Sequence, residues 1–139
     1  MTAIFAIRDR LQRDDGLPAL LDTGYTAFEL LLAALEEHED PASGMFAQFV
    51  FAATHAANGR DAILSAPSLP ARPLHRADAN IDGRGSGAGV PDIVALSRVL
   101  CRVLAQSAGS VPGRDDQAAC LHAARSAAAI HRLLTGADP

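Results

Sequence analysis

The sequence contains no lysine, because all 12 of its basic residues are arginine. Schiff-base catalysis needs an amine side chain, and the phosphate-binding loop of nucleotide hydrolases needs a lysine after its glycines. Both chemistries are therefore excluded. Heavy use of Ala, Arg, Gly and Pro without Lys also indicates a high-G+C bacterial genome, which predicts the source of the protein and not its function.

Long apolar runs are missing as well. Glu29, Gln48 and Arg98 interrupt the best candidates, so none approaches the ~18 residues needed to cross a bilayer. The N-terminus lacks the basic-then-apolar order of a secretory signal. The only two cysteines, Cys101 and Cys120, fall in separate predicted helices and are most simply small buried apolar residues, with a disulfide as the less favoured alternative. We expect a cytoplasmic protein with no membrane partner.

Local metal-binding and nucleophile motifs are absent. Di-metal sites in helical bundles place a Glu three residues before a His, but the residues at that spacing before the four helical histidines are leucine or alanine. No two histidines lie four residues apart, no CxxC occurs, and no GxSxG elbow is present. The sequence predicts no metal and no cofactor.

The charge is acidic and unevenly spread. The formal net charge is −4, and residues 1–40 contain three Arg against nine acids. A nucleic-acid partner is not expected, because there is no basic stripe to neutralise phosphates. The run 36–40 (EEHED) is interpreted as the solvated acidic end of a helix, with a regulatory ion or an arginine-bearing partner as the alternative.

A chain of 139 residues has room for one core, so we expect a single helical domain over 1–139. Apolar residues recur at helical spacing and no segment alternates as a strand does. The pattern predicts an all-α bundle of roughly five helices. Their expected ranges are 2–13, from 22 or 23 to 38, 41–57, 92–108, and from 115 or 116 to 134, with a short helical turn at 17–22 and another at 60–65.

Residues 67–91 change composition to four Pro and four Gly with no apolar period. This segment is predicted to be a long crossover loop between the third and fourth helices. Its alternating glycines do not match the dinucleotide-binding fingerprint, and no strand precedes them. A flexible connection is the favoured interpretation, and a lid over a site is the alternative.

The third predicted helix is apolar nearly all round, since Met45, Ala47 and Phe51 lie away from its main stripe. Such a helix is usually central or lies at a subunit interface. We therefore expect a homodimer that buries part of this helix. A Phe51 fully buried within one chain would contradict that expectation.

The most interesting polar pair is Gln48 and His55, which are seven residues apart and therefore share a stripe of this helix. His55 is interpreted first as a satisfied core or interface residue, and as the catalytic acid–base group if the protein is an enzyme. Tyr25 and Glu29 on the preceding helix are their predicted partners.

Arginine supplies the other candidate ligand-binding group. Arg98 and Arg102, at i and i+4, form either a solvated face or a clamp for a carboxylate or phosphate. His122 and His131 lie on opposite sides of the last helix, and His122 is the better functional candidate of these two.

No motif identifies a function, so three functional hypotheses are ranked. The leading hypothesis is a protein that binds an apolar small molecule as a homodimer, with Gln48, His55, Tyr25, Glu29, Arg98 and Arg102 as candidate ligand-binding residues. The alternative is a cofactor-free cyclase or isomerase of specialised metabolism that uses His55. A structural or regulatory protein-interaction module is the third hypothesis. An enclosed pocket lined by Gln48 and His55 favours the enzyme, and a solid core there favours the interaction module.

Overall fold

A computed structural model describes residues 3–70 and 87–139 of the chain. It confirms the predicted all-α bundle, with five helices and no strand in that part of the chain. The helices are α1 (Ala3–Leu11), α2 (Leu17–Glu37), α3 (Phe46–Leu64), α5 (Val90–Ala108) and α6 (Arg114–Thr135). Most of the predicted loop at 67–91 lies outside the described residues.

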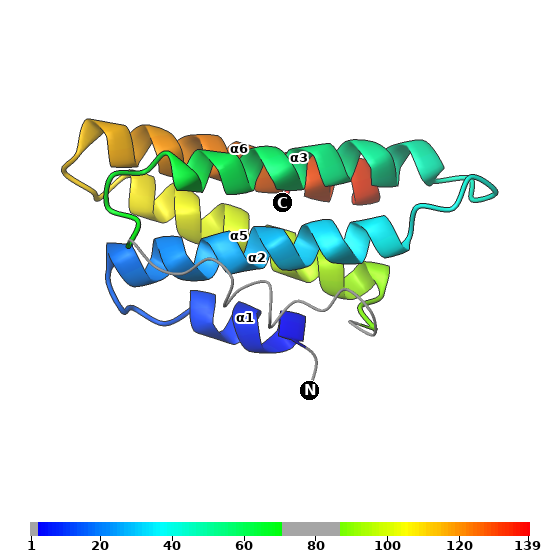
Figure 1. Cartoon of the computed structure of the whole chain (residues 1–139), viewed down its shortest axis with the longest axis horizontal. Helices are drawn as coiled ribbons and strands as arrows, with labels where there is room; N and C mark the ends of the chain where they lie inside the picture. Colours follow the sequence, from blue (N-terminus) through cyan, green and yellow to red (C-terminus); the bar gives the residue numbers. More distant parts are fainter. Residues whose placement is uncertain (1–2, 71–86) are drawn as a thin grey trace.

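The four long helices form a ring in the order α2, α3, α6, α5, in which each helix packs against its two neighbours (Figure 1). The short helix α1 lies against both α2 and α5. It fits there because Ile4, Ile7 and Leu11, at helical spacing, are all buried. The outer faces of α3 and α6 receive no such covering helix among the described residues.

The connection from α3 to α5 starts and finishes at opposite ends of the bundle. Just after α3, the backbone N–H and the hydroxyl of Ser68 donate to the buried carboxylate of Asp116, at 3.0 and 2.5 Å, in the first turn of α6. Just before α5, the Ala88 carbonyl lies 3.0 Å from Nε2 of His38, at the end of α2. The His38 ring also stacks on Phe49. Side chains thus anchor both ends of this connection.

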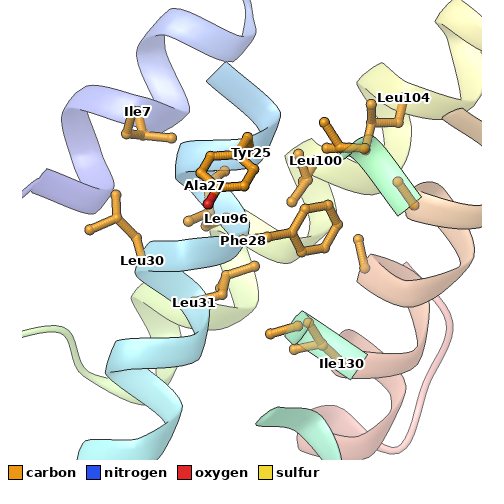
Figure 2. Close-up of a cluster of buried hydrophobic side chains, with 14 of the residues drawn as sticks. Ile7, Tyr25, Ala27, Phe28, Leu30, Leu31, Leu96, Leu100, Leu104 and Ile130 are labelled. Carbon is orange, nitrogen blue, oxygen red and sulfur yellow. The ribbon is translucent and has the colours of Figure 1, made fainter. Parts of the chain in front are cut away.

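The core is filled by side chains from all five helices. Figure 2 shows Phe28 and Leu31 of α2 facing Leu100 of α5 and Ile130 of α6, and all four are fully buried. The α2 and α3 helices approach closely because α3 has a glycine, Gly59, where Phe28 needs room. A Cβ atom at Gly59 would lie 2.2 Å from the Phe28 ring.

This close contact explains why the predicted end of the third helix at residue 57, just before Asn58-Gly59, is wrong. The helix continues to Leu64 because Gly59 accommodates a neighbour instead of forming a turn. The predicted start at Pro41 is also wrong. The Asp40 carboxylate accepts a hydrogen bond from the Ala42 amide, so residues 40–45 form turns and α3 starts at Phe46.

The other helix boundaries differ by smaller amounts. The expected short turn at 17–22 is the first part of α2, since Pro18 occupies an early helical position and no break follows it. The predicted start of the fourth helix at residue 92 is two residues late, because α5 starts at Val90 after the N-cap Gly89, and Asp92 accepts a hydrogen bond from the Gly89 amide. The last helix runs one residue past its predicted end at 134, and Gly136 ends it with a left-handed φ of 77°.

None of the helices within residues 3–70 and 87–139 is long and apolar enough to cross a membrane.

Candidate functional site

Among the described residues, the most exposed large apolar side chain lies on the outer side of α3. Phe51 is 57% exposed, although the equally apolar Phe49 two residues earlier is buried. We call the surface around it the Phe51 face. It consists of the residues three, four and seven positions away on the same side of the helix, which are Ala47, Gln48, Thr54, His55 and Asn58, together with Phe51 itself.

Phe51 differs in its surroundings from Phe5, the other markedly exposed phenylalanine. Phe5 on α1 is 48% exposed, but the guanidinium of Arg8 lies 5.0 Å above its ring, so a cation–π contact covers one face. Among the described residues no such contact covers the ring of Phe51. Aromatic residues are enriched at protein interfaces, which makes the uncovered ring of Phe51 a candidate contact residue.

The Phe51 face carries no formal charge. Between Asp40 and Arg60 the chain contains neither an acid nor an arginine, which is a gap of 19 residues. Ala47, Thr54 and Asn58 are exposed, and Gln48 and His55 are partly buried. Depletion of charge around an exposed aromatic residue distinguishes the centre of an interface from ordinary protein surface.

Gln48 and His55 therefore share a face, as the sequence predicts, and they lie on either side of Phe51. No hydrogen bond joins either side chain to another residue of 3–70 or 87–139. Asn58, three residues after His55, lines a groove with residues of α6, whereas Arg60 reaches α2 on the other side of α3.

The predicted partners on α2 do not join this pair. The carboxylate of Glu29 forms a 2.8 Å ion pair with Arg60, and this hydrogen bond raises the pKa of the Arg60 guanidinium. Arg60 is five residues after His55, which places the two about 140° apart around α3. Tyr25 is buried in the cluster that contains Ile7 and Leu100 (Figure 2). Neither Tyr25 nor Glu29 belongs to the Phe51 face.

The two arginines of α5 lie on a third surface, since α5 packs between α2 and α6 and is diagonal to α3 in the ring. Arg102 approaches Gln12 of the segment after α1, with Nη2 3.5 Å from its amide oxygen. Nη2 of Arg98 lies 3.5 Å from Nε2 of His131. The six predicted site residues thus do not meet in one place, and only Gln48 and His55 share a surface.

His131 has a structural role that its sequence position did not indicate. It is 3% exposed, and its Nδ1 lies 2.9 Å from the Ala137 carbonyl oxygen. Because a carbonyl oxygen only accepts, Nδ1 carries the hydrogen, and Nε2 is left to accept from Arg98. His131 therefore holds the residues after α6 against its last turn. His122, by contrast, is exposed at the groove between α3 and α6.

Two grooves lie on the surface of the described part, and neither includes Gln48 or His55. One runs between the end of α3 and the start of α6, past Asp61, Asp115 and His122. The other lies between the α1–α2 connection and the end of α5, where Arg102 and Gln12 line it. Both are lined largely by exposed polar and charged residues, which suits neither an apolar ligand nor a desolvated catalytic group.

Cysteine and metal chemistry add little to this surface. Cys101 and Cys120 are free thiols, and burial raises the pKa of both. Within residues 3–70 and 87–139, no three His, Cys, Asp or Glu side chains gather in a way that could hold a metal ion.

The sequence pattern identified Gln48 and His55 as a pair and placed Ala47 and Phe51 away from the main stripe, but it did not join them with Thr54 and Asn58 into one face. Ala47, Phe51, Thr54 and Asn58 recur at intervals of four, three and four residues, which is the spacing of a helix-pairing stripe. That spacing, combined with the gap in charge, was the available signal.

Comparison with protein-family models, with curated proteins and with solved structures finds no match to this chain.

Proposed function

We propose that this protein is an interaction module that forms a homodimer through the Phe51 face of α3. The observation that carries the proposal is the 57% exposure of Phe51 in the middle of a helical surface without formal charge. Burying an exposed phenylalanine against a partner removes a large apolar area from water, which is the main favourable term in protein association.

The composition of the face supports a protein partner. Its small residues, Ala47 and Thr54, let a second helix approach closely, and its partly buried polar residues, Gln48 and His55, have donors and acceptors for hydrogen bonds across an interface. A second copy of the chain is a suitable partner because an uncharged surface meets itself without electrostatic repulsion.

Binding of an apolar small molecule and acid–base catalysis by His55 receive less support from the geometry. Ala52 and Ala56, on the inner side of the same helix, are fully buried in the core, and of the two grooves described above only the one between α3 and α6 touches the Phe51 face, at Asn58. Within residues 3–70 and 87–139, His55 has no carboxylate or hydroxyl partner to orient it, whereas an acid–base group needs a positioned proton acceptor or donor.

The proposal is tested by analytical ultracentrifugation of the whole chain and of Phe51→Glu. We expect the wild-type protein to be a dimer at micromolar concentration. A charge at position 51 places two carboxylates at the centre of the interface and should weaken dimerisation by about 100-fold or more. Leu121→Glu is the matched control, since Leu121 is also exposed, at 40%, but lies on α6.

The control should dimerise as the wild type does, and circular dichroism should show that both variants keep their helix content. A wild-type protein that stays monomeric at hundreds of micromolar would exclude the homodimer.

A further inference from the structure

We infer that protonation of His55 separates the two protomers, so that the Phe51 face pairs two copies of the chain at neutral pH and releases them in mild acid. This inference rests on the proposed function, because it assigns a pH-dependent control to the same surface. It is carried by the position of His55 on that surface and by the charged residues around it.

His55 lies next to the most exposed residue of the Phe51 face. It is four residues after Phe51, so the two side chains are neighbours on the surface of α3. The imidazole is partly buried, and no hydrogen bond joins it to another described residue. A partner that covers the ring of Phe51 therefore also covers His55 and takes its imidazole out of water.

No acidic residue of α3 lies beside His55. Residues 41–59 contain neither Asp nor Glu. The next acid of the helix, Asp61, lies six residues after His55, about 9 Å along the helix axis, and its carboxylate contacts Arg60 at 3.3 Å. Asp61 and Asp115 of α6 line the groove that the Phe51 face reaches only at its edge.

The acids of α2 lie on the other flank of α3. The carboxylate of Glu29 is held by Arg60 at 2.8 Å, and Arg60 lies about 140° around α3 from His55. Glu36 and Glu37 are exposed in the last turn of α2, the helix that Arg60 reaches. None of these carboxylates belongs to the Phe51 face.

Beyond its first turn, the charged residues of α6 are all basic. Residues 117–137 contain no acid but have two histidines and two arginines. His122 lines the groove together with Asn58, which is one turn after His55 on α3. Because α3 and α6 run in opposite directions (Figure 1), the next exposed charged residue of α6 toward the level of His55 is Arg125. A proton on His55 thus adds positive charge beside a basic stretch of α6.

A second copy of the same face offers His55 no anion either. In a two-fold symmetric dimer both protomers contribute the same patch, whichever way the two helices run. The partner therefore brings only the alanine, glutamine, phenylalanine, threonine, histidine and asparagine side chains of the Phe51 face. A neutral imidazole fits among them because it both donates and accepts hydrogen bonds. An imidazolium taken out of water without an anion is strongly disfavoured.

The direction of the pH dependence follows from this difference. An unperturbed imidazole is neutral above about pH 6.5, so the dimer keeps its full stability there and loses it as the pH falls below that value. The charge of the whole chain predicts the opposite trend. Protonating the five histidines nearly cancels the formal net charge of −4, so repulsion between two copies decreases in acid. Dissociation in mild acid is therefore a specific sign of a titrating group inside the interface.

Sedimentation of the whole chain at about pH 7.5 and about pH 5.5 tests the inference. We expect the Kd of the wild-type dimer to rise by about tenfold or more in acid, because each dimer contains two copies of His55. His55→Gln is uncharged at both values, so its dimer should not weaken in acid. His55→Arg is charged at both values and should dimerise poorly even at neutral pH.

His122→Gln is the matched control, because His122 is an exposed histidine of α6 outside the Phe51 face. It should keep the pH dependence of the wild type. Circular dichroism at both pH values establishes that each protein keeps its helix content.

The possible failures are distinct. A wild-type dimer that does not weaken in acid would overturn the inference and leave the homodimer standing. Acid dissociation that persists in His55→Gln, or disappears in His122→Gln, would assign the control to another residue and would overturn the inference as well. A wild-type chain that is monomeric at neutral pH would overturn the proposed function itself, and the inference with it.

Discussion

The inner and outer faces of α3 contain similar residues but are packed in opposite ways. On the inner face Phe49 is 5% exposed, Ala52 and Ala56 are fully buried, and Gly59 lies directly under the ring of Phe28. On the outer face Phe51 projects from the bundle with more than half of its surface in solvent. One face therefore stabilises the monomer, and the other is available to a partner.

This contrast shows that apolar character alone does not assign a residue to the core. Phenylalanine and alanine occur on both sides of α3, so hydrophobic periodicity within this helix is weak and cannot separate buried from exposed positions. What separates the two faces is their neighbours: α2 and α6 cover the inner face, whereas no described element covers the outer one.

The largest expected effect comes from truncating two phenylalanines: Phe28 of α2, which packs against the inner face of α3, and Phe51 on the outer face. Phe28→Ala removes a fully buried ring at the α2–α3 contact and should lower the free energy of unfolding by about 3–5 kcal/mol. Phe51→Ala should change the unfolding free energy of the monomer by no more than about 0.5 kcal/mol while weakening the dimer. Urea unfolding followed by circular dichroism at low protein concentration measures the first quantity. Equal losses of unfolding free energy in the two variants would mean that Phe51 is packed within the monomer as Phe28 is.

The sequence was sufficient to predict the class of fold, because the apolar stripes of α5 and α6 follow a clear helical period. It failed at the boundaries of α3, where local signals conflict with packing. Asp40-Pro41 resembles a helix start but forms a turn, and Asn58-Gly59 resembles a helix end but lies inside the helix. At Gly59 the deciding contact is with Phe28 on another helix, which sequence spacing cannot reveal, whereas at Asp40 it is a local hydrogen bond from the Ala42 amide that competes with the helix start.

The candidate site was predictable only in part, for a related reason. Gln48 and His55 share a face because seven residues make nearly two helical turns, which spacing alone establishes. Their separation from Tyr25 and Glu29 depends on how α2 and α3 are rotated about their axes. That rotation is fixed by Gly59 and Phe28, and nothing in the local pattern of either helix encodes it.

A second pair of variants compares Gly59, which packs against Phe28, with Gly44, which has open space around it. A methyl group at Gly59 would lie 2.2 Å from the buried Phe28 ring, so Gly59→Ala forces the two helices apart. Alanine's higher helix propensity returns about 1 kcal/mol, and we expect a net loss of about 1–3 kcal/mol of unfolding free energy. Gly44, before α3, is the matched control, since a Cβ there meets nothing within 4 Å.

Gly44→Ala should leave the unfolding free energy within about 0.5 kcal/mol of wild type. The same urea titrations measure both variants. A stable Gly59→Ala protein would mean that Phe28 has room to move and that the contact between α2 and α3 is looser than this structure describes.

The smallest expected effect concerns two neighbouring charges on opposite flanks of α3. Arg60 points toward α2, where its 2.8 Å ion pair with Glu29 is mostly shielded, since the Glu29 side chain is 15% exposed. Asp61 also contacts Arg60, at 3.3 Å, but its side chain is 64% exposed.

Glu29→Gln should cost about 1 kcal/mol of unfolding free energy, because a partly buried guanidinium loses its anionic partner while some solvent screening remains. Asp61→Asn should cost less than about 0.5 kcal/mol, as is typical of exposed pairs. Urea unfolding at low and at high salt checks both values. Salt should change the difference in urea midpoint between the wild type and Glu29→Gln only slightly, because a shielded ion pair is poorly screened. If Asp61→Asn proved the more destabilising of the two, the exposed ion pair of Asp61 would contribute more to the unfolding free energy than the shielded pair with Glu29.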